Sequence, residues 1–172
     1  KGRCYWLRVY EIPEGSKNSK GRAIQNMLNI EADDKVTAYL RVVSLSDADY
    51  NASHNIVFAT KRGVVKKTSL ADYARPRQKG IIAININEGD SVIGAVLTEG
   101  DSQIVLANRN GRAIRFEENK VRVMGRGATG VRGMELDDET DEIVGMICMR
   151  KGSGDDVLVV SEQGYGKRSD LD

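Results

Sequence analysis

Short apolar runs alternate along this chain with polar turns that contain glycine. Three segments, 56–70, 104–118 and 157–171, share one pattern of an apolar run, a polar turn ending in glycine, and a second run that carries basic residues. A partial copy, KGRCYWLRVY, opens the chain. Short β-branched runs on either side of a glycine turn predict β-hairpins, and no segment has a sustained helical period.

Each predicted hairpin is followed by the same further elements in the same order. A second glycine precedes a third apolar run, an acidic turn comes next, and a last apolar run closes the unit. The third runs are 23–30, 81–87 and 131–136, and the last runs are 35–43, 91–98 and 142–149. Four short strands in a unit of roughly 50 residues are typical of propeller blades.

The repeats therefore predict an all-β, propeller-like fold with blades of four short antiparallel strands. One such sheet cannot bury both of its faces, so we expect the blades to stack. We expect a single repeat domain over 1–172 that is a fragment of a longer protein. Its predicted blades are 1–52, incomplete at its N-terminus, 53–101, 102–155, and the start of a fourth at 156–172.

Charge alternates in phase with these repeats, although the net charge is only +1. Residues 61–80 hold seven Lys or Arg and one acidic residue, whereas 81–103 hold four acidic residues and no basic one. The same contrast separates 109–132 from 133–156. A nearly neutral chain can thus present a basic track, which is the electrostatic footprint of nucleic-acid binding.

The candidate DNA-binding residues are the basic side chains of the hairpins and of the loops that follow them. Lys67, Arg115 and Arg168 occupy equivalent positions, four residues after a turn glycine, and are expected to project alike from successive blades. Long cationic side chains suit phosphate, and a duplex that follows a curved row of them must bend. The full set is Arg8, Lys20, Arg22, Lys66, Lys67, Arg75, Arg77, Lys79, Arg115, Arg122, Arg126, Arg132, Lys167 and Arg168.

The sequence contains no motif for a metal site, a redox-active cysteine pair or a nucleotide-binding loop. Cys4 and Cys148 form no C-x-x-C pair, and His54, the only histidine, has no metal ligand at a suitable spacing. The glycine-rich segment 125–130 lacks the Lys-Ser/Thr of a phosphate-binding loop. We predict no catalytic residue and no metal site, and the absence of a long apolar run predicts no membrane association.

The motifs KGRCYWLRVYEIPE, ATKRGVVKKTSLADYARPRQKGIIAININEGD and RAIRFEENKVRVMGRGATGVRG resemble successive blades of the DNA gyrase A C-terminal domain. The resemblance implies a six-bladed β-pinwheel in which blades exchange strands. It also implies double-stranded DNA wrapped around a basic outer rim, in support of ATP-dependent negative supercoiling. The parent would be a cytoplasmic, nucleoid-associated type II topoisomerase, a heterotetramer with two copies each of gyrase A and gyrase B. ATP and Mg²⁺ would act on its other domains, with no cofactor in this part.

The sequence departs from that family in two respects, and two alternative functions stay open. The glutamine- and arginine-rich box of the family is absent, and residues 77–80 are only weakly similar to it. About three blades and the start of a fourth are present, which is too few for a closed ring. The alternatives are the equivalent domain of topoisomerase IV and, in another class, a propeller that binds only protein partners.

Overall fold

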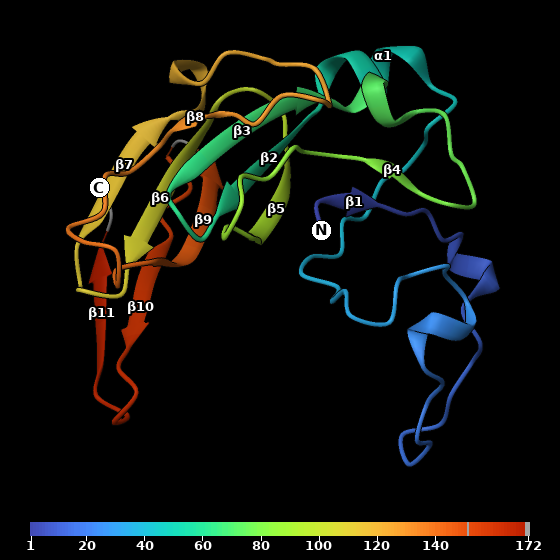
Figure 1. Ribbon diagram of the computed structural model, residues 1–172, viewed down its shortest axis with the longest axis horizontal. Coiled ribbons are helices and arrows are strands. Elements are labelled where there is room, and N and C mark those ends of the chain that lie inside the picture. The colour runs from blue at the N-terminus through green and yellow to red at the C-terminus, as the bar shows by residue number, and fades with distance from the viewer. Residues whose placement is uncertain (151, 171–172) are drawn as a thin grey trace.

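The computed structural model describes residues 1–150 and 152–170, and its strands form four antiparallel sheets that follow one another across the molecule in chain order (Figure 1). The sheet orders are β1-β4, β5-β2-β3-β8, β7-β6-β9 and β10-β11. The strands are β1 (Arg3–Cys4), β2 (Asn55–Thr60), β3 (Val64–Ser69), β4 (Ile81–Ile82), β5 (Val92–Thr98), β6 (Ser102–Asn108), β7 (Ala113–Glu117), β8 (Val131–Arg132), β9 (Ile143–Arg150), β10 (Asp156–Val160) and β11 (Gly166–Asp170).

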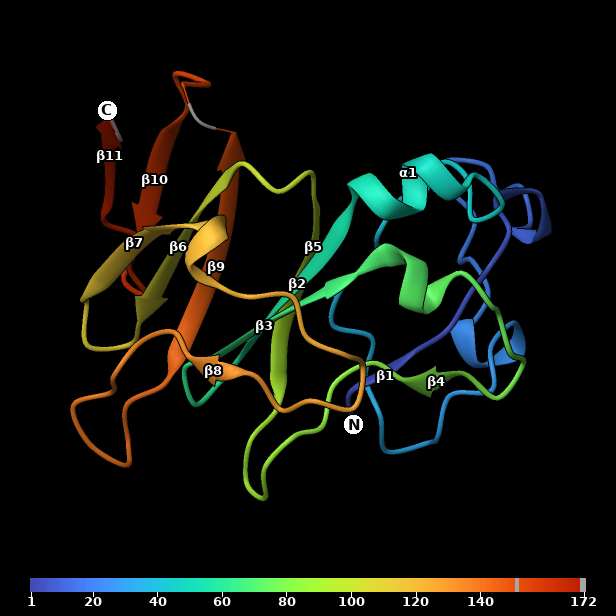
Figure 2. The same ribbon diagram turned by 90° about the horizontal axis from the view of Figure 1, so that it is seen from above.

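Two sheets are completed by a strand from the following repeat. β8 comes after β6 and β7 in the chain, yet it pairs with β3, where Val64 lies opposite Arg132. In the same way β4 pairs with β1, where Arg3 lies opposite Ile82. Figure 2 shows β8 next to β3 and β4 next to β1. The all-β, propeller-like fold class is confirmed, and the blades exchange strands as the resemblance implied.

The first repeat contains less sheet than its sequence predicts. Segment 23–30 forms the 3₁₀ helix η2 (Ile24–Asn26) instead of a strand, and no strand forms in 35–43. In later repeats the third run pairs with the preceding repeat, and the last run pairs with the first strand of its own hairpin. For the first repeat, the described residues contain neither a preceding repeat nor the first strand of its own hairpin. Its apolar runs therefore have no ladder to join.

Short helices lie in the segments between strands. The helix α1 (Ala48–Ser53) begins after Asp47, whose carboxylate accepts a hydrogen bond from the Tyr50 amide at 3.0 Å. Three 3₁₀ helices join it: η1 (Val9–Glu11) in the first repeat, η3 (Leu70–Tyr73) after β3, and η4 (Glu118–Lys120) after β7. At six residues, α1 is too short for a helical period to have predicted it.

Both faces of the central sheet are buried, which confirms that the blades stack. Alternate residues of β2 face opposite ways. Val57 and Ala59 join a core cluster with Ile104 and Leu106 of the next sheet. Ile56 and Phe58 join a second cluster with residues of η3 and of the segment after β4. The stacked sheets thus hold neighbouring repeats at a fixed spacing.

Gly63 gives a direct test of close packing between repeats. Its φ of +84° favours glycine, and an added Cβ would lie 2.4 Å from the Met134 carbonyl oxygen. Gly111 has nearly the same φ, +85°, at the equivalent turn, but its Cβ would meet open space. We expect Gly63→Ala to lower the free energy of unfolding by about 3 kcal/mol and Gly111→Ala by about 1–2 kcal/mol. Chemical denaturation checks this, and equal losses would contradict it.

Candidate nucleic-acid interface

Three arginines from two repeats meet at the junction between them. Arg75 and Arg77 lie in the loop after η3, and Arg126 lies in the loop after η4. All three line a cavity of about 360 Å³, whose other walls are Ala71, Asp72 and Ile81. Five guanidinium N–H donors on each side chain, gathered around one hollow, form a site suited to a phosphate group.

Local hydrogen bonds place the first two arginines. The Ser69 hydroxyl oxygen caps η3 by accepting a hydrogen bond from the Ala71 amide at 3.3 Å. The helix closes at Ala74, and Pro76 fixes the backbone between the two arginines. The buried side chains of Leu70 and Tyr73 anchor this turn to the core. The 3₁₀ turn therefore directs the following basic loop outward from a rigid base.

Arg126 is held by the neighbouring repeat. Its guanidinium donates to the Ile82 carbonyl oxygen at 3.3 Å, and its own carbonyl oxygen accepts from the Lys66 ammonium at 2.5 Å. The Asn85 side-chain amide donates to the Gly127 carbonyl oxygen at 2.6 Å. The loop runs along the upper edge of the central sheet in Figure 1, in gold to orange. It is thus fastened to the segment that follows β4.

The opposite end of the sheets carries cations that are held by residues of the acidic turns, two of them through ion pairs. Lys61, in the turn between β2 and β3, pairs with Glu142 at 2.6 Å. Arg62 donates to the Glu139 carbonyl oxygen at 2.7 Å, and Arg112 forms an ion pair with Asp137. The acidic turns therefore compensate the hairpin turns, which lie beside the starts of β5 and β9.

The loops after η3 and η4 differ in charge from that end. Their basic residues Arg75, Arg77, Lys79 and Arg122 are exposed and make no salt bridge to any residue that the structure describes. These four cations thus differ from Lys61 and Arg112, which are ion-paired with acidic residues.

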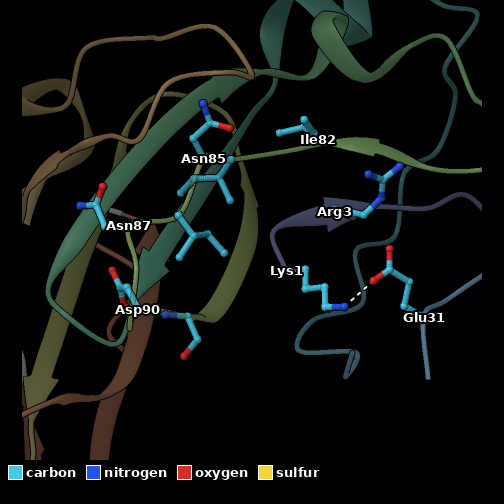
Figure 3. A pocket seen from close by; sticks show the side chains of 10 residues that line it. Lys1, Arg3, Glu31, Ile82, Asn85, Asn87 and Asp90 are labelled. Carbon is cyan, nitrogen blue, oxygen red and sulfur yellow. Dashed lines mark hydrogen bonds and ion pairs between the residues drawn. The ribbon is translucent and has the colours of Figure 1, made fainter. Parts of the chain in front are cut away.

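A larger hollow of about 550 Å³ lies between the first and second repeats (Figure 3). Its lining mixes cations with acidic and neutral residues, including Lys1, Arg3, Glu31 and Asp90. The Lys1 ammonium pairs with Glu31 and, at 2.6 Å, with Asp33. This charge balance makes it less suited to phosphate than the arginine-lined cavity.

Lys66 and Lys67 were predicted on the basic track, and the structure places both inside the protein. Lys66 has no exposed surface, and Lys67 is 6% exposed. The Lys67 ammonium donates to the Glu118 carbonyl oxygen at 3.1 Å and lies 3.8 Å from the Glu118 carboxylate. The prediction is wrong because the next repeat covers β3: the Met124 amide donates to the Lys67 carbonyl oxygen at 2.7 Å.

The equivalence of Lys67, Arg115 and Arg168 holds in register but not in exposure. They lie opposite Val57, Val105 and Leu158 in their hairpins. Arg115 and Arg168 are not buried, because no described segment covers β7 or β11 as β8 covers β3. The expectation that all three project alike into solvent is therefore wrong for Lys67.

The remaining predicted residues lie on other elements. Arg168 pairs with Asp156 through its Nε atom at 2.5 Å, and Arg132 pairs with Glu135 at 3.5 Å. Arg8 precedes η1 and is hydrogen-bonded to the Tyr10 hydroxyl. None of these lines the arginine cavity, and neither do Lys20, Arg22, Lys79, Arg122 and Lys167.

Sequence reasoning missed Asp72 and Asn85. Asp72 contributes the acidic group of the cavity wall, and the Ser-x-x-Asp pattern of 69–72 could have indicated a capped turn there. Asn85 holds the loop of the next repeat through its side chain and through its backbone amide, which donates to the Ala128 carbonyl oxygen at 3.2 Å. No sequence signal shows such a contact between repeats.

The described residues form no metal-binding cluster and no disulfide. Within 1–150 and 152–170, no three His, Cys, Asp or Glu side chains are placed to hold a metal ion. Cys4 and Cys148 are half-buried free thiols. No helix in the described part of the chain has the length and apolar character needed to cross a membrane.

Sheets that exchange strands between repeats, with three arginines gathered at one junction, define a propeller-type repeat domain with an arginine-lined cavity between two repeats. A family model described as the DNA gyrase C-terminal domain, a β-propeller, matches residues 1–42, 54–99, 102–148 and 155–172. The chain belongs to this family, which confirms the resemblance found in its sequence.

Individual relatives agree with this membership. The DNA gyrase A protein of Salmonella typhimurium is 45% identical over 172 residues, which are 100% of this chain and 19% of that protein. The chain therefore spans about a fifth of the length of the curated relatives it matches. Two solved structures each align with 99% of the chain. The C-terminal domain of DNA topoisomerase IV has a TM-score of 0.85 at 28% identity, over 51% of its chain, and the DNA gyrase A C-terminal domain has 0.77 at 26%, over 52%.

Proposed function

We propose that this chain binds duplex DNA through its phosphate backbone and bends it along the positive edge of the stacked sheets. The observation that carries the proposal is the cavity where Arg75, Arg77 and Arg126 of two repeats converge. A duplex that contacts this junction and the exposed cations of neighbouring repeats meets several phosphate sites along a row. Family membership supports the same function.

The energetics favour contacts to the backbone over contacts to bases. Bending 20–30 base pairs by 40–90° costs about 1–6 kcal/mol, which several phosphate contacts with counterion release can offset. The basic residues sit on loops and short turns, and the described residues contain no helix long enough to enter a major groove. We therefore expect weak sequence preference and strong salt dependence.

The activity of the whole protein extends this proposal. The parent would be a gyrase A protein, as the relatives' names suggest, and it would pair with itself and with gyrase B, as the resemblance of the sequence implies. The bent duplex would be delivered to a strand-passage step that uses ATP and Mg²⁺ on other domains. This part of the chain would have no catalytic role.

The salt dependence of DNA affinity tests the proposal. We expect the affinity of the full-length protein for a duplex to fall steeply between about 50 and 200 mM salt, by a factor of about 3 for each phosphate contact. Binding titrations with two unrelated duplex sequences measure both this slope and the sequence preference. An affinity that does not change with salt would favour the propeller that binds only proteins.

The topoisomerase IV alternative is supported by the high structural similarity to that domain. Ligation of nicked circles in the presence of the full-length protein separates the two proposals. A gyrase-type wrap shifts the linking number of the closed circles, and the shift grows with protein concentration. Binding without such a shift would favour the topoisomerase IV type of domain.

A further inference from the structure

Lys66 is a buried cation that joins two repeats. It lies on β3 with no exposed surface. Its ammonium donates to the Ala83 carbonyl oxygen at 2.6 Å and to the Arg126 carbonyl oxygen at 2.5 Å. Ala83 belongs to the second repeat and Arg126 to the third. The ammonium also lies 5.7 Å from the centre of the Phe58 ring.

We propose that Lys66 is a positioning residue, which fixes Arg126 in place against Arg75 and Arg77 and so sets the shape of the phosphate-binding cavity. The inference rests on the proposed function of that cavity. Lys66 does not touch DNA itself, because it has no exposed surface. Its effect on binding passes through the backbone of Arg126.

The other bonds to this loop do not replace that of Lys66. Asn85 holds Gly127 and Ala128, and the Lys67 carbonyl oxygen accepts from the Met124 amide. These are neutral hydrogen bonds on either side of Arg126. Among the described residues, Lys66 alone holds the carbonyl group of Arg126, and it does so with a charged donor, which makes stronger hydrogen bonds than a neutral one.

The surroundings of Lys66 make its charge sensitive to pH. Burial is the main cause that lowers the pKa of Lys66 to about 8; the charge of Arg126 acts in the same direction, and that of Asp72 opposes it. Two further titratable groups belong to the core cluster beside it. Burial raises the pKa of Cys4 to about 11 and also raises the pKa of Tyr73, whose hydroxyl donates to the Ala83 carbonyl oxygen at 2.9 Å. Both therefore stay protonated at about pH 9.

A double-mutant cycle tests the positioning role in the full-length protein. We expect Lys66→Met to weaken duplex affinity about threefold to tenfold, on the order of one phosphate contact. In an Arg126→Ala background the same change should cost less than about twofold, because the group that it positions is gone. In an Arg22→Ala background, where the lost cation lies in the first repeat, the cost should remain complete.

A pH profile gives a second readout that needs no substitution. Between about pH 7 and 9 the unmodified protein should lose affinity about threefold to tenfold as Lys66 loses its proton. Lys66→Arg, whose guanidinium stays charged, should bind without this pH dependence. The free energy of unfolding should instead increase over this range. Between a pH of about 8 and the ordinary lysine pKa of 10.5, the unfolded chain binds more protons at Lys66 than the folded protein does. Folding therefore becomes more favourable as pH rises. General unfolding would instead lower affinity and stability together.

Two outcomes overturn the inference. One is a folded Lys66→Met protein with unchanged affinity, or with a loss that is just as large in the Arg126→Ala background. The other is a loss of affinity across the same pH range that is just as large in the Lys66→Arg protein, because that protein keeps the charge and another group must then cause the loss. Failure of the proposed function has a different signature, because the unmodified protein would then show no salt-dependent DNA binding at all.

Discussion

Replacing Arg75, Arg77 and Arg126 together by alanine is expected to weaken duplex DNA binding on the order of 100-fold at about 0.1 M salt. The three side chains line one cavity at the junction between two repeats. Each phosphate contact contributes about 0.9 to the slope of log affinity against log salt, so the slope should fall by about 2.7. Titrations of the full-length protein at several salt concentrations measure both quantities.

A matched triple variant removes the same number of cations from the other end of the sheets. All three lie in hairpin turns: Lys61 and Arg112 are ion-paired with Glu142 and Asp137, and Arg62 donates to the Glu139 carbonyl oxygen. Their replacement by alanine should change DNA affinity less than about threefold, which is below the loss expected for one phosphate contact. If both triples weakened binding equally, net charge rather than the arginine cavity would determine affinity.

Replacing Glu118 by alanine is expected to lower the free energy of unfolding by about 3–5 kcal/mol. Glu118 has no exposed surface, and its carboxylate accepts from the Thr98 hydroxyl at 2.7 Å and the Ser102 amide at 3.3 Å. It also lies 3.8 Å from the ammonium of Lys67 on the preceding repeat. Its loss leaves a buried lysine without its counter-charge and two donors without an acceptor. Chemical denaturation followed by circular dichroism measures the change.

Two further variants separate charge from hydrogen bonding at this junction. Glu118→Gln keeps an acceptor but removes the charge, so it should cost less than Glu118→Ala. Adding Lys67→Met to Glu118→Gln should cost less than Lys67→Met alone, because the unpaired cation is then removed as well. Glu135→Ala serves as the control, since that exposed residue pairs with Arg132 at the surface and should contribute under about 1 kcal/mol. Strict additivity at Glu118 and Lys67 would show that the two side chains do not interact.

The repeat pattern predicted the parts of the fold that depend on local sequence. Strands β2, β3, β5, β6, β7 and β9 lie where the apolar runs predict them, because each has a partner within its own repeat. Segments 23–30 and 35–43 carry similar patterns but form no strand. Apolar alternation indicates that a strand can form, whereas pairing depends on a partner that lies elsewhere in the chain.

In the candidate site, too, the sequence predicts the features that depend on local residues but not those that depend on contacts between repeats. Exposure of the loop that carries Arg75 and Arg77 follows from its polar composition and its proline, and the sequence indicates it. Burial of Lys66 and Lys67 does not, because consecutive lysines on a strand are usually solvated, and here the next repeat covers them. Contacts between repeats also bring Arg126 beside Arg77, which lies far from it in sequence.

The strand that each repeat lends to its predecessor limits how such an array can change in length. Deleting the second or the third repeat would remove its own sheet. It would also remove β4 or β8, respectively, from the sheet before it and leave an unpaired edge there. Units that share no strands can be gained or lost one at a time, as in simple solenoids. In this architecture a change in repeat number has to re-join two interrupted ladders at once, and local melting of one unit exposes its neighbour to pairing with a foreign chain.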